Sequence, residues 1–311
     1  MVLKRFLSIL AAGLVFLTGV GCKGADQPPE QSDKLSVCVS FYPMYDFAAK
    51  IGGEHVSLTN LVPAGTEPHD WEPRPADIAA LEKADVFIYN GAGMEHWVDG
   101  VLDALSTEKL VIVETSHGLT QATEQKDEHS DEEEDDHGGL DPHVWLDPVL
   151  VKEQAVAIRD AFVKADPEHQ ADYESNYQTF VGQLDELDQE FRKTLEPLPG
   201  KDIVVAHAAF GYLCRRYGLN QVAAEGFSPD SEPGPAQLSK LISYAREHQI
   251  RVIFFEELTS PKVAEVIARE IGAETAVLNP LEGLTPEQEA AGEDYFSVMR
   301  RNLEALKLAL E

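Results

Sequence analysis

Three histidines stand in sequence settings that restrain a side chain. His69 follows a proline in the turn-rich loop 63–73, His143 lies between two Asp-Pro turns, and His207 comes directly after the apolar run 202–206. Imidazole nitrogens are common zinc ligands. For each histidine alone, a hydrogen-bonded structural role is an equally good interpretation. Together, three backbones restrained by proline or by a strand end favour a transition-metal site, although their spacing carries no local metal-binding signature.

A second feature is the acidic tract 117–139, which carries His117, His129 and His137 among Asp and Glu residues. Like charges repel and almost nothing apolar is present to be buried, so we expect a mobile loop that does not pack. One interpretation is a solvated run of charge. The other is an accessory metal-capture loop that binds zinc weakly and quickly and is dispensable for tight binding.

The elements that must hold these residues follow from the apolar pattern. Near-continuous apolar runs are typical of strands that are buried in parallel sheets, and helical patterns lie between them. The runs form two sets of four: 35–40, 56–62, 85–89 and 110–114, then 203–206, 221–224, 252–255 and 275–278. We therefore predict an α/β fold with two lobes, each with a parallel sheet of about four strands flanked by helices.

A long helix is predicted between the two sets, in the segment 166–199. Its apolar residues recur at steps of three and four, which indicates a single helical stripe. They are Tyr173, Tyr177, Phe180, Leu184, Leu187, Phe191 and Leu195. Thirty residues of helix span ~45 Å, so this spine helix can link an N-terminal lobe, 35–165, to a C-terminal lobe, 200–311. Ligands bind outside the carboxyl ends of strands in such folds, so histidines from both lobes can converge on a cleft between them.

The N-terminus resembles a secretory signal. Lys4 and Arg5 precede an apolar stretch, 6–20, that is too short for a comfortable membrane span, and a small residue then precedes Cys22. We expect residues 1–21 to be a lipoprotein signal peptide and Cys22 to be the lipidated residue, followed by a polar tether, 22–34. Plain cleavage beside an incidental cysteine is the alternative. The expected localisation is extracytoplasmic, anchored by lipid to the bacterial cell membrane or held in the periplasm.

Composition narrows the class of partner. The 311 residues include 25 Lys and Arg against 55 Asp and Glu, a formal net charge of −30. Nucleic acid is excluded as a partner because its phosphates would be repelled. The later cysteines, Cys38 and Cys214, lie far apart in apolar patterns, so we expect buried free thiols rather than a disulfide.

Several ordered motifs resemble those of the zinc/manganese ABC-transporter substrate-binding proteins. The resemblance covers essentially the whole mature chain and includes the signal and the acidic tract. The motifs are Pro68-His69-Asp70-Trp71-Glu72-Pro73 with Asp77, Asp141-Pro142-His143-Val144-Trp145-Leu146-Asp147-Pro148, Ala206-His207-Ala208-Ala209-Phe210-Gly211-Tyr212 with Tyr217-Gly218-Leu219, and Phe254-Phe255-Glu256 with Ser260-Pro261-Lys262.

The resemblance implies one metal ion between two lobes and its delivery to an ABC permease and its ATPase. His69, His143 and His207 match the family's ligand positions. Members with His at the third position resemble zinc binders, and those with Glu resemble manganese binders. Zn²⁺ is therefore the expected ion, with Mn²⁺ as the alternative, and three imidazoles also suit zinc chemically. We expect a monomeric receptor for zinc transport and not an enzyme.

The fourth ligand stays open. Many relatives place an Asp in the late strand that here reads Leu278-Asn279-Pro280-Leu281, and Asn279 is neutral and a poorer ligand. The candidates are water, Glu67, Asn279 or Glu256. For Glu256 we expect instead the role of accepting a hydrogen bond from a ligand imidazole. Asn279 as a turn residue before proline is an equally good interpretation.

Two rival classes remain. An open zinc ion with three histidines also serves hydrolytic enzymes, which would need a substrate pocket and a base such as Glu67 or Glu256. No metalloprotease helix motif is present, and ligands from two lobes favour capture and release. A surface adhesin with a structural metal ion is the other, less favoured class.

Overall fold

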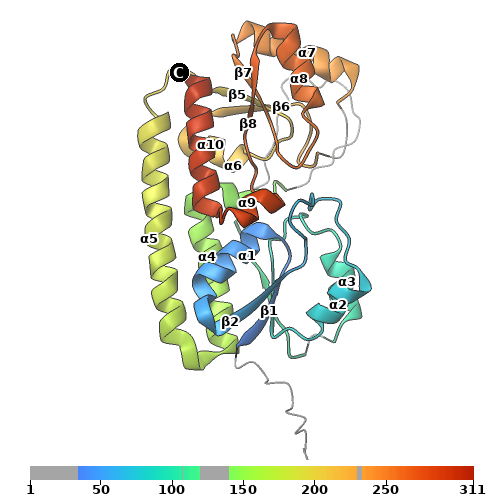
Figure 1. Ribbon diagram of the computed structural model, residues 1–311, viewed down its shortest axis with the longest axis vertical. Helices are drawn as coiled ribbons and strands as arrows, with labels where there is room; N and C mark the ends of the chain where they lie inside the picture. The colour runs from blue at the N-terminus through green and yellow to red at the C-terminus, as the bar shows by residue number, and fades with distance from the viewer. Residues whose placement is uncertain (1–33, 107, 120–139, 230–232) are drawn as a thin grey trace, which may run out of the picture. The chain divides into compact units, whose positions relative to one another are not determined.

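Two four-stranded parallel sheets organise the chain (Figure 1). The structure, a computed structural model, describes residues 34–106, 108–119, 140–229 and 233–311. The first sheet has the order β2-β1-β3-β4 and the second the order β6-β5-β7-β8. The strands are β1 (Leu35–Val39), β2 (Val56–Asn60), β3 (Val86–Tyr89), β4 (Val111–Glu114), β5 (Asp202–Val205), β6 (Asn220–Ala223), β7 (Val252–Phe255) and β8 (Glu274–Val277). All paired strands run parallel, which confirms the predicted pair of α/β sheets.

Burial differs between central and edge strands. The central strands β1, β3, β5 and β7 are mostly buried, whereas the edge strands β2, β4, β6 and β8 expose part of their residues. An edge strand has only one neighbouring strand and fewer helices over it, so burial on both faces holds for the centre of each sheet alone.

Helices connect successive strands, as parallel pairing requires. They lie between the strands, where helical patterns were predicted. The helices are α1 (Tyr42–Gly52), α2 (Pro75–Leu81), α3 (Val98–Ala104), α4 (Pro148–Ala165), α5 (Gln170–Leu195), α6 (Gly211–Tyr217), α7 (Pro235–Glu247), α8 (Lys262–Ile271), α9 (Pro286–Ala290) and α10 (Tyr295–Leu310), with 3₁₀ turns η1 (Gly53–His55), η2 (Val144–Leu146) and η3 (Pro167–His169).

The long helix α5 contacts elements associated with both sheets. It packs on α1 and α4, which belong with the first sheet, and on α6 and α10, which belong with the second (Figure 1). Its predicted stripe is buried except for Tyr177, which is partly buried. One apolar cluster runs through this helix and includes Val39 of β1 and Val205 of β5. The sheets therefore share a core, which supports the predicted linking role of the helix.

Residues Lys34–Glu311 cluster as a single compact unit, so lobe boundaries at 165/166 and 199/200 stay predictions. The signal peptide, Cys22, His129 and His137 lie outside the described residues. In the described part of the chain, none of the helices has the length and apolarity needed to cross a bilayer. Cys38 and Cys214 are buried free thiols, as predicted.

Candidate metal centre

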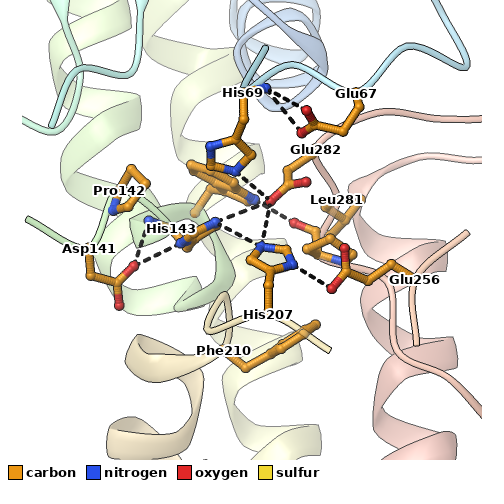
Figure 2. A network of polar contacts seen from close by, with 12 residues as sticks. Glu67, His69, Asp141, Pro142, His143, His207, Phe210, Glu256, Leu281 and Glu282 are labelled. Atoms are coloured by element: carbon orange, nitrogen blue, oxygen red, sulfur yellow. Dashed lines mark hydrogen bonds and ion pairs between the residues drawn. The ribbon is translucent and has the colours of Figure 1, made fainter. Parts of the chain in front are cut away.

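Four buried or nearly buried side chains from four separate segments converge on one point (Figure 2). His69 comes from the loop after β2, His143 from the turn before η2, and His207 from the segment after β5. The fourth is Glu282, in the segment that follows β8. His143 and His207 are fully buried, Glu282 is 2% exposed, and the His69 side chain is 7% exposed. The strands thus deliver three of the four groups at or after their carboxyl ends.

Four of the six distances between the donor atoms match the edges of a tetrahedron, and all four atoms lie within 4.8 Å of one another. Oε1 of Glu282 lies 3.3 Å from Nε2 of His69, 3.1 Å from Nε2 of His143 and 3.3 Å from Nε2 of His207. The Nε2 atoms of His143 and His207 are 3.4 Å apart. Zinc–nitrogen bonds of 2.0–2.1 Å in a regular tetrahedron give edges of about 3.3–3.4 Å. These four distances are therefore compatible with a small tetrahedral ion between the atoms.

Buried carboxylates fix the orientation of two of the imidazoles. Oδ1 of Asp141 lies 2.9 Å from Nδ1 of His143 and also accepts a hydrogen bond from the His143 backbone N–H at 3.0 Å. Oε1 of Glu256 lies 2.5 Å from Nδ1 of His207. When Nδ1–H donates to a carboxylate, the Nε2 lone pair faces the centre, which is the tautomer that metal ligation requires.

The charges at the centre are tightly coupled. Burial alone would raise the pKa of Glu282, but positive charge on His207 and His69 holds this pKa well below its usual value. Burial alone would lower the pKa of His207, but the carboxylates of Glu256 and Glu282 hold it well above its usual value. The centre thus favours an ionised carboxylate surrounded by positive charge, which either protons or a bound cation can supply.

The candidates for a fourth ligand lie in different places around this centre. Glu67 accepts hydrogen bonds from the backbone N–H of His69 at 3.0 and 3.1 Å. Glu256 contacts His207 as described, on the side of the ring away from the other imidazoles (Figure 2). Asn279 donates to Glu257 and accepts from the backbone N–H of Leu281, so both ends of its amide are engaged elsewhere.

Glu282 is the residue that sequence reasoning missed. Asn279 forms an Asx turn through the Leu281 N–H at 2.7 Å, and Leu281 adopts a left-handed φ of 60°. This backbone conformation is uncommon for a residue with a side chain. It turns the chain sharply, and the next residue, Glu282, then enters the centre. The available signal was a carboxylate five residues after β8, close to the carboxyl end of a strand.

The acidic tract is represented in the described residues only by its start. His117 is 84% exposed in its side chain and lies 3.6 Å from Glu114, outside the four-residue centre. Within the described ranges, only one group of three or more His, Cys, Asp and Glu side chains is placed to hold a metal ion.

The chain is similar to known zinc-uptake proteins. A family model described as zinc-uptake complex component A, periplasmic, matches residues 37–309. The chain is 40% identical to the high-affinity zinc uptake system protein ZnuA of Bacillus subtilis, over 99% of this chain and 98% of that protein. It is 38% identical to the zinc-binding lipoprotein AdcA of Streptococcus pneumoniae, over 97% of this chain but only 60% of that longer protein.

Solved structures give the same picture. The crystal structure of the metal-dependent lipoprotein YcdH from Bacillus subtilis matches with a TM-score of 0.77 at 42% identity, covering 89% of this chain and all of that one. Similarity at this level shows the fold, and the family-model match over residues 37–309 spans the four segments that meet at the centre.

Proposed function

The chain belongs to the family of periplasmic zinc-uptake component A proteins, and we propose that it is the extracytoplasmic zinc receptor of an ABC importer. In this proposal His69, His143, His207 and Glu282 bind one Zn²⁺ ion, and the loaded protein delivers it to a membrane permease that is driven by an ATPase. The observation that carries the proposal is the set of donor–donor distances of 3.1–3.4 Å around Glu282.

Zinc is favoured over manganese by the donor set. Three imidazole nitrogens and one carboxylate oxygen at tetrahedral spacing suit Zn²⁺, whereas Mn²⁺ prefers more oxygen ligands in an octahedron. Close packing of the buried donors leaves little room for the additional ligands that an octahedral ion would need. Manganese binding is the weaker alternative for this centre.

Capture without catalysis is favoured for the same reason. A catalytic zinc ion keeps one position open for water or substrate. In this proposal four protein atoms complete the tetrahedron, which leaves no position at which a water molecule could be activated. Glu67 and Glu256, which could have served as a base, are instead engaged with the His69 backbone and the His207 ring.

Binding in this proposal is an exchange of protons for an ion. Neutral imidazoles are needed as ligands, while the carboxylates of Glu256 and Glu282 favour protonated His207 in the metal-free protein. Zinc must therefore displace protons. Asp141 and Glu256 pair with the Nδ1 atoms of His143 and His207, so these two carboxyl groups orient ligand rings whose Nε2 atoms face the ion.

We also propose that Cys22 carries the lipid anchor and that the acidic tract, with His117, His129 and His137, is an accessory that captures zinc weakly. We propose as well that the chain has an N-terminal lobe at 35–165 and a C-terminal lobe at 200–311, with the spine helix, 166–199, between them.

The test is metal analysis of protein purified under native conditions, joined to a competition titration of Zn²⁺ against Mn²⁺. The parent should contain one zinc ion per chain and prefer zinc strongly, and His143→Ala should lose tight binding. His96→Ala is the matched control, because the His96 side chain is 49% exposed and pairs with Glu72, outside the four-residue centre. Equal affinity for both metals, or metal-dependent hydrolysis that His143→Ala abolishes, would overturn the proposal.

A further inference from the structure

The peptide group that leads into His143 is held at both ends by buried side chains. Its carbonyl oxygen, on Pro142, accepts a hydrogen bond from Nδ2 of Asn90 at 3.0 Å. Its N–H, on His143, donates to Asp141 at 3.0 Å. The plane of this peptide sets the direction in which the His143 side chain leaves the backbone. Asn90 is fully buried and lies directly after β3.

The orientation of the Asn90 amide follows from its partners. Its nitrogen faces two backbone carbonyls, those of Gly91 and Pro142, both at 3.0 Å, and carbonyl oxygens can only accept. Its oxygen must therefore face a donor, and Nε2 of Gln154 lies 3.1 Å away. No other assignment of the two amide atoms satisfies these contacts.

Gln154 extends the network into the helix layer. It lies in α4 and is fully buried. Its Nε2 also donates to the hydroxyl of Thr115 at 3.0 Å, which in turn donates to the carbonyl of Tyr89 at 3.2 Å. The Oε1 atom of Gln154 is buried and has no hydrogen-bond partner among the described residues. Leaving a buried amide oxygen without a partner costs free energy of folding. Gln154 contributes to this network only as a donor, through the two hydrogen bonds of its Nε2 atom.

The backbone of Asn90 is anchored independently. The carboxylate of Glu95 accepts hydrogen bonds from the N–H groups of Asn90 and Gly91, at 2.8 and 2.9 Å, and from the Ser40 hydroxyl at 2.6 Å. Asn90 is thereby held at its backbone by one side chain and at its amide by another. It reaches across 52 residues of sequence to the turn that carries His143.

We infer that Asn90, supported by Gln154, is a positioning residue that sets zinc affinity by fixing the His143 turn, without contacting the ion. This inference rests on the proposed function. Donors at tetrahedral spacing bind tightly only if the backbone beneath them cannot relax. Groups that orient a metal ligand typically change metal affinity by 10–100-fold when they are removed.

The test compares Asn90→Ala with Ile158→Ala. Ile158 is fully buried in the same helix as Gln154 and has no polar contact, so its variant controls for loss of stability alone. Zinc affinity is measured by chelator competition, thermal unfolding is measured on the metal-free proteins, and Co²⁺-loaded samples report the ligand geometry through their visible absorption. Asn90→Ala is expected to lose roughly 10–100-fold in zinc affinity and to weaken the bands of four-coordinate Co²⁺. Ile158→Ala should keep both.

Further variants keep the inference falsifiable if Asn90→Ala does not fold. Gln154→Leu keeps the volume and removes both donated hydrogen bonds, and it should lower zinc affinity several-fold, less than Asn90→Ala. Parental affinity and Co²⁺ spectra in folded Asn90→Ala or Gln154→Leu would overturn the inference, as would an equal loss in Ile158→Ala. The parent and His143→Ala separate the two proposals. If the parent fails to bind zinc tightly, the proposed function is wrong, whereas tight binding that only His143→Ala abolishes refutes the role of Asn90 alone.

Discussion

Replacing Glu282 by Gln isolates the charge of the fourth donor. The amide has nearly the same shape, and its oxygen can occupy the position of Oε1, which lies 3.1–3.3 Å from the three imidazole nitrogens. The substitution therefore removes one negative charge from a largely buried centre. A neutral amide oxygen is a weaker zinc ligand than a carboxylate oxygen.

The expected loss follows from burial. In a low-dielectric interior the attraction between a carboxylate and a divalent ion is large, but part of it offsets the cost of desolvating the carboxylate. Removing one partner of a buried charge pair costs about 3–5 kcal/mol. At 1.4 kcal/mol per tenfold, this corresponds to a roughly 10²–10⁴-fold weaker zinc affinity. Glu256→Gln, which acts through the ring of His207, should lose only about 10–100-fold.

Chelator competition at pH 7.5 measures these affinities, and thermal unfolding of the metal-free variants checks that each is folded. Glu67→Gln is the matched control, because Glu67 contacts the backbone of the His69 loop rather than a ligand ring. The order of loss should be Glu282, then Glu256, then Glu67. A Glu282→Gln variant that binds within tenfold of the parent, or a larger loss in Glu67→Gln, would refute this account of the centre.

Zinc affinity should fall between pH 7.5 and 5, because the raised pKa of His207 makes protons compete with the ion, and a flat profile in the same competition assay would contradict this. In metal-free protein, protonation of His207 also stabilises the fold, because its pKa is higher in the folded state than in the unfolded state. This contribution to the free energy of unfolding is fully present below about pH 6.5 and is lost as pH rises through the folded-state pKa. Denaturant titrations at successive pH values can follow it. Deleting 123–137 should leave tight zinc binding within a few-fold of the parent in the competition assay, whereas His143→Ala should abolish it. Burial raises the pKa of Asp46 to about 6, so its ionised form destabilises the fold at neutral pH and stability from this group rises as pH falls from 6 to 4. Asp46→Asn should flatten that part of the stability profile in thermal melts, and an unchanged profile would refute the assignment.

Much of the fold follows from patterns that are local in sequence. The apolar runs and the stripe from Tyr173 to Leu195 depend only on spacing, and each forms the predicted strand or helix. Burial of the edge strands was overestimated, because an apolar run does not reveal how many neighbours its strand will have. The three histidines were also accessible to sequence reasoning, because proline or a strand end restrains each one locally.

Glu282 was not accessible in the same way. Its position depends on the Asx turn of Asn279 and on the left-handed conformation of Leu281, and Leu281 is not a residue type that signals such a turn. The sequence prediction considered Asn279 as a weak ligand, whereas the carboxylate at the centre belongs to Glu282, three residues later. Asn90 was hidden for a different reason, since its partner Pro142 lies 52 residues away and only the folded chain brings them together.

The contacts that preorganise the centre are also the ones that oppose binding. Contacts between the Glu282 carboxylate and the three imidazoles hold the donor atoms at nearly the spacing that zinc requires. The ion therefore gains a site that needs little ordering, which favours affinity. It must also displace the protons that stabilised that arrangement, which reduces affinity at acidic pH. Stronger pairing of Glu282 with His207 would sharpen the geometry and at the same time raise the competition from protons. Asp141 and Glu256 act in both directions as well, because they hold the rings in place without occupying the tetrahedron and also favour the protonated forms of His143 and His207.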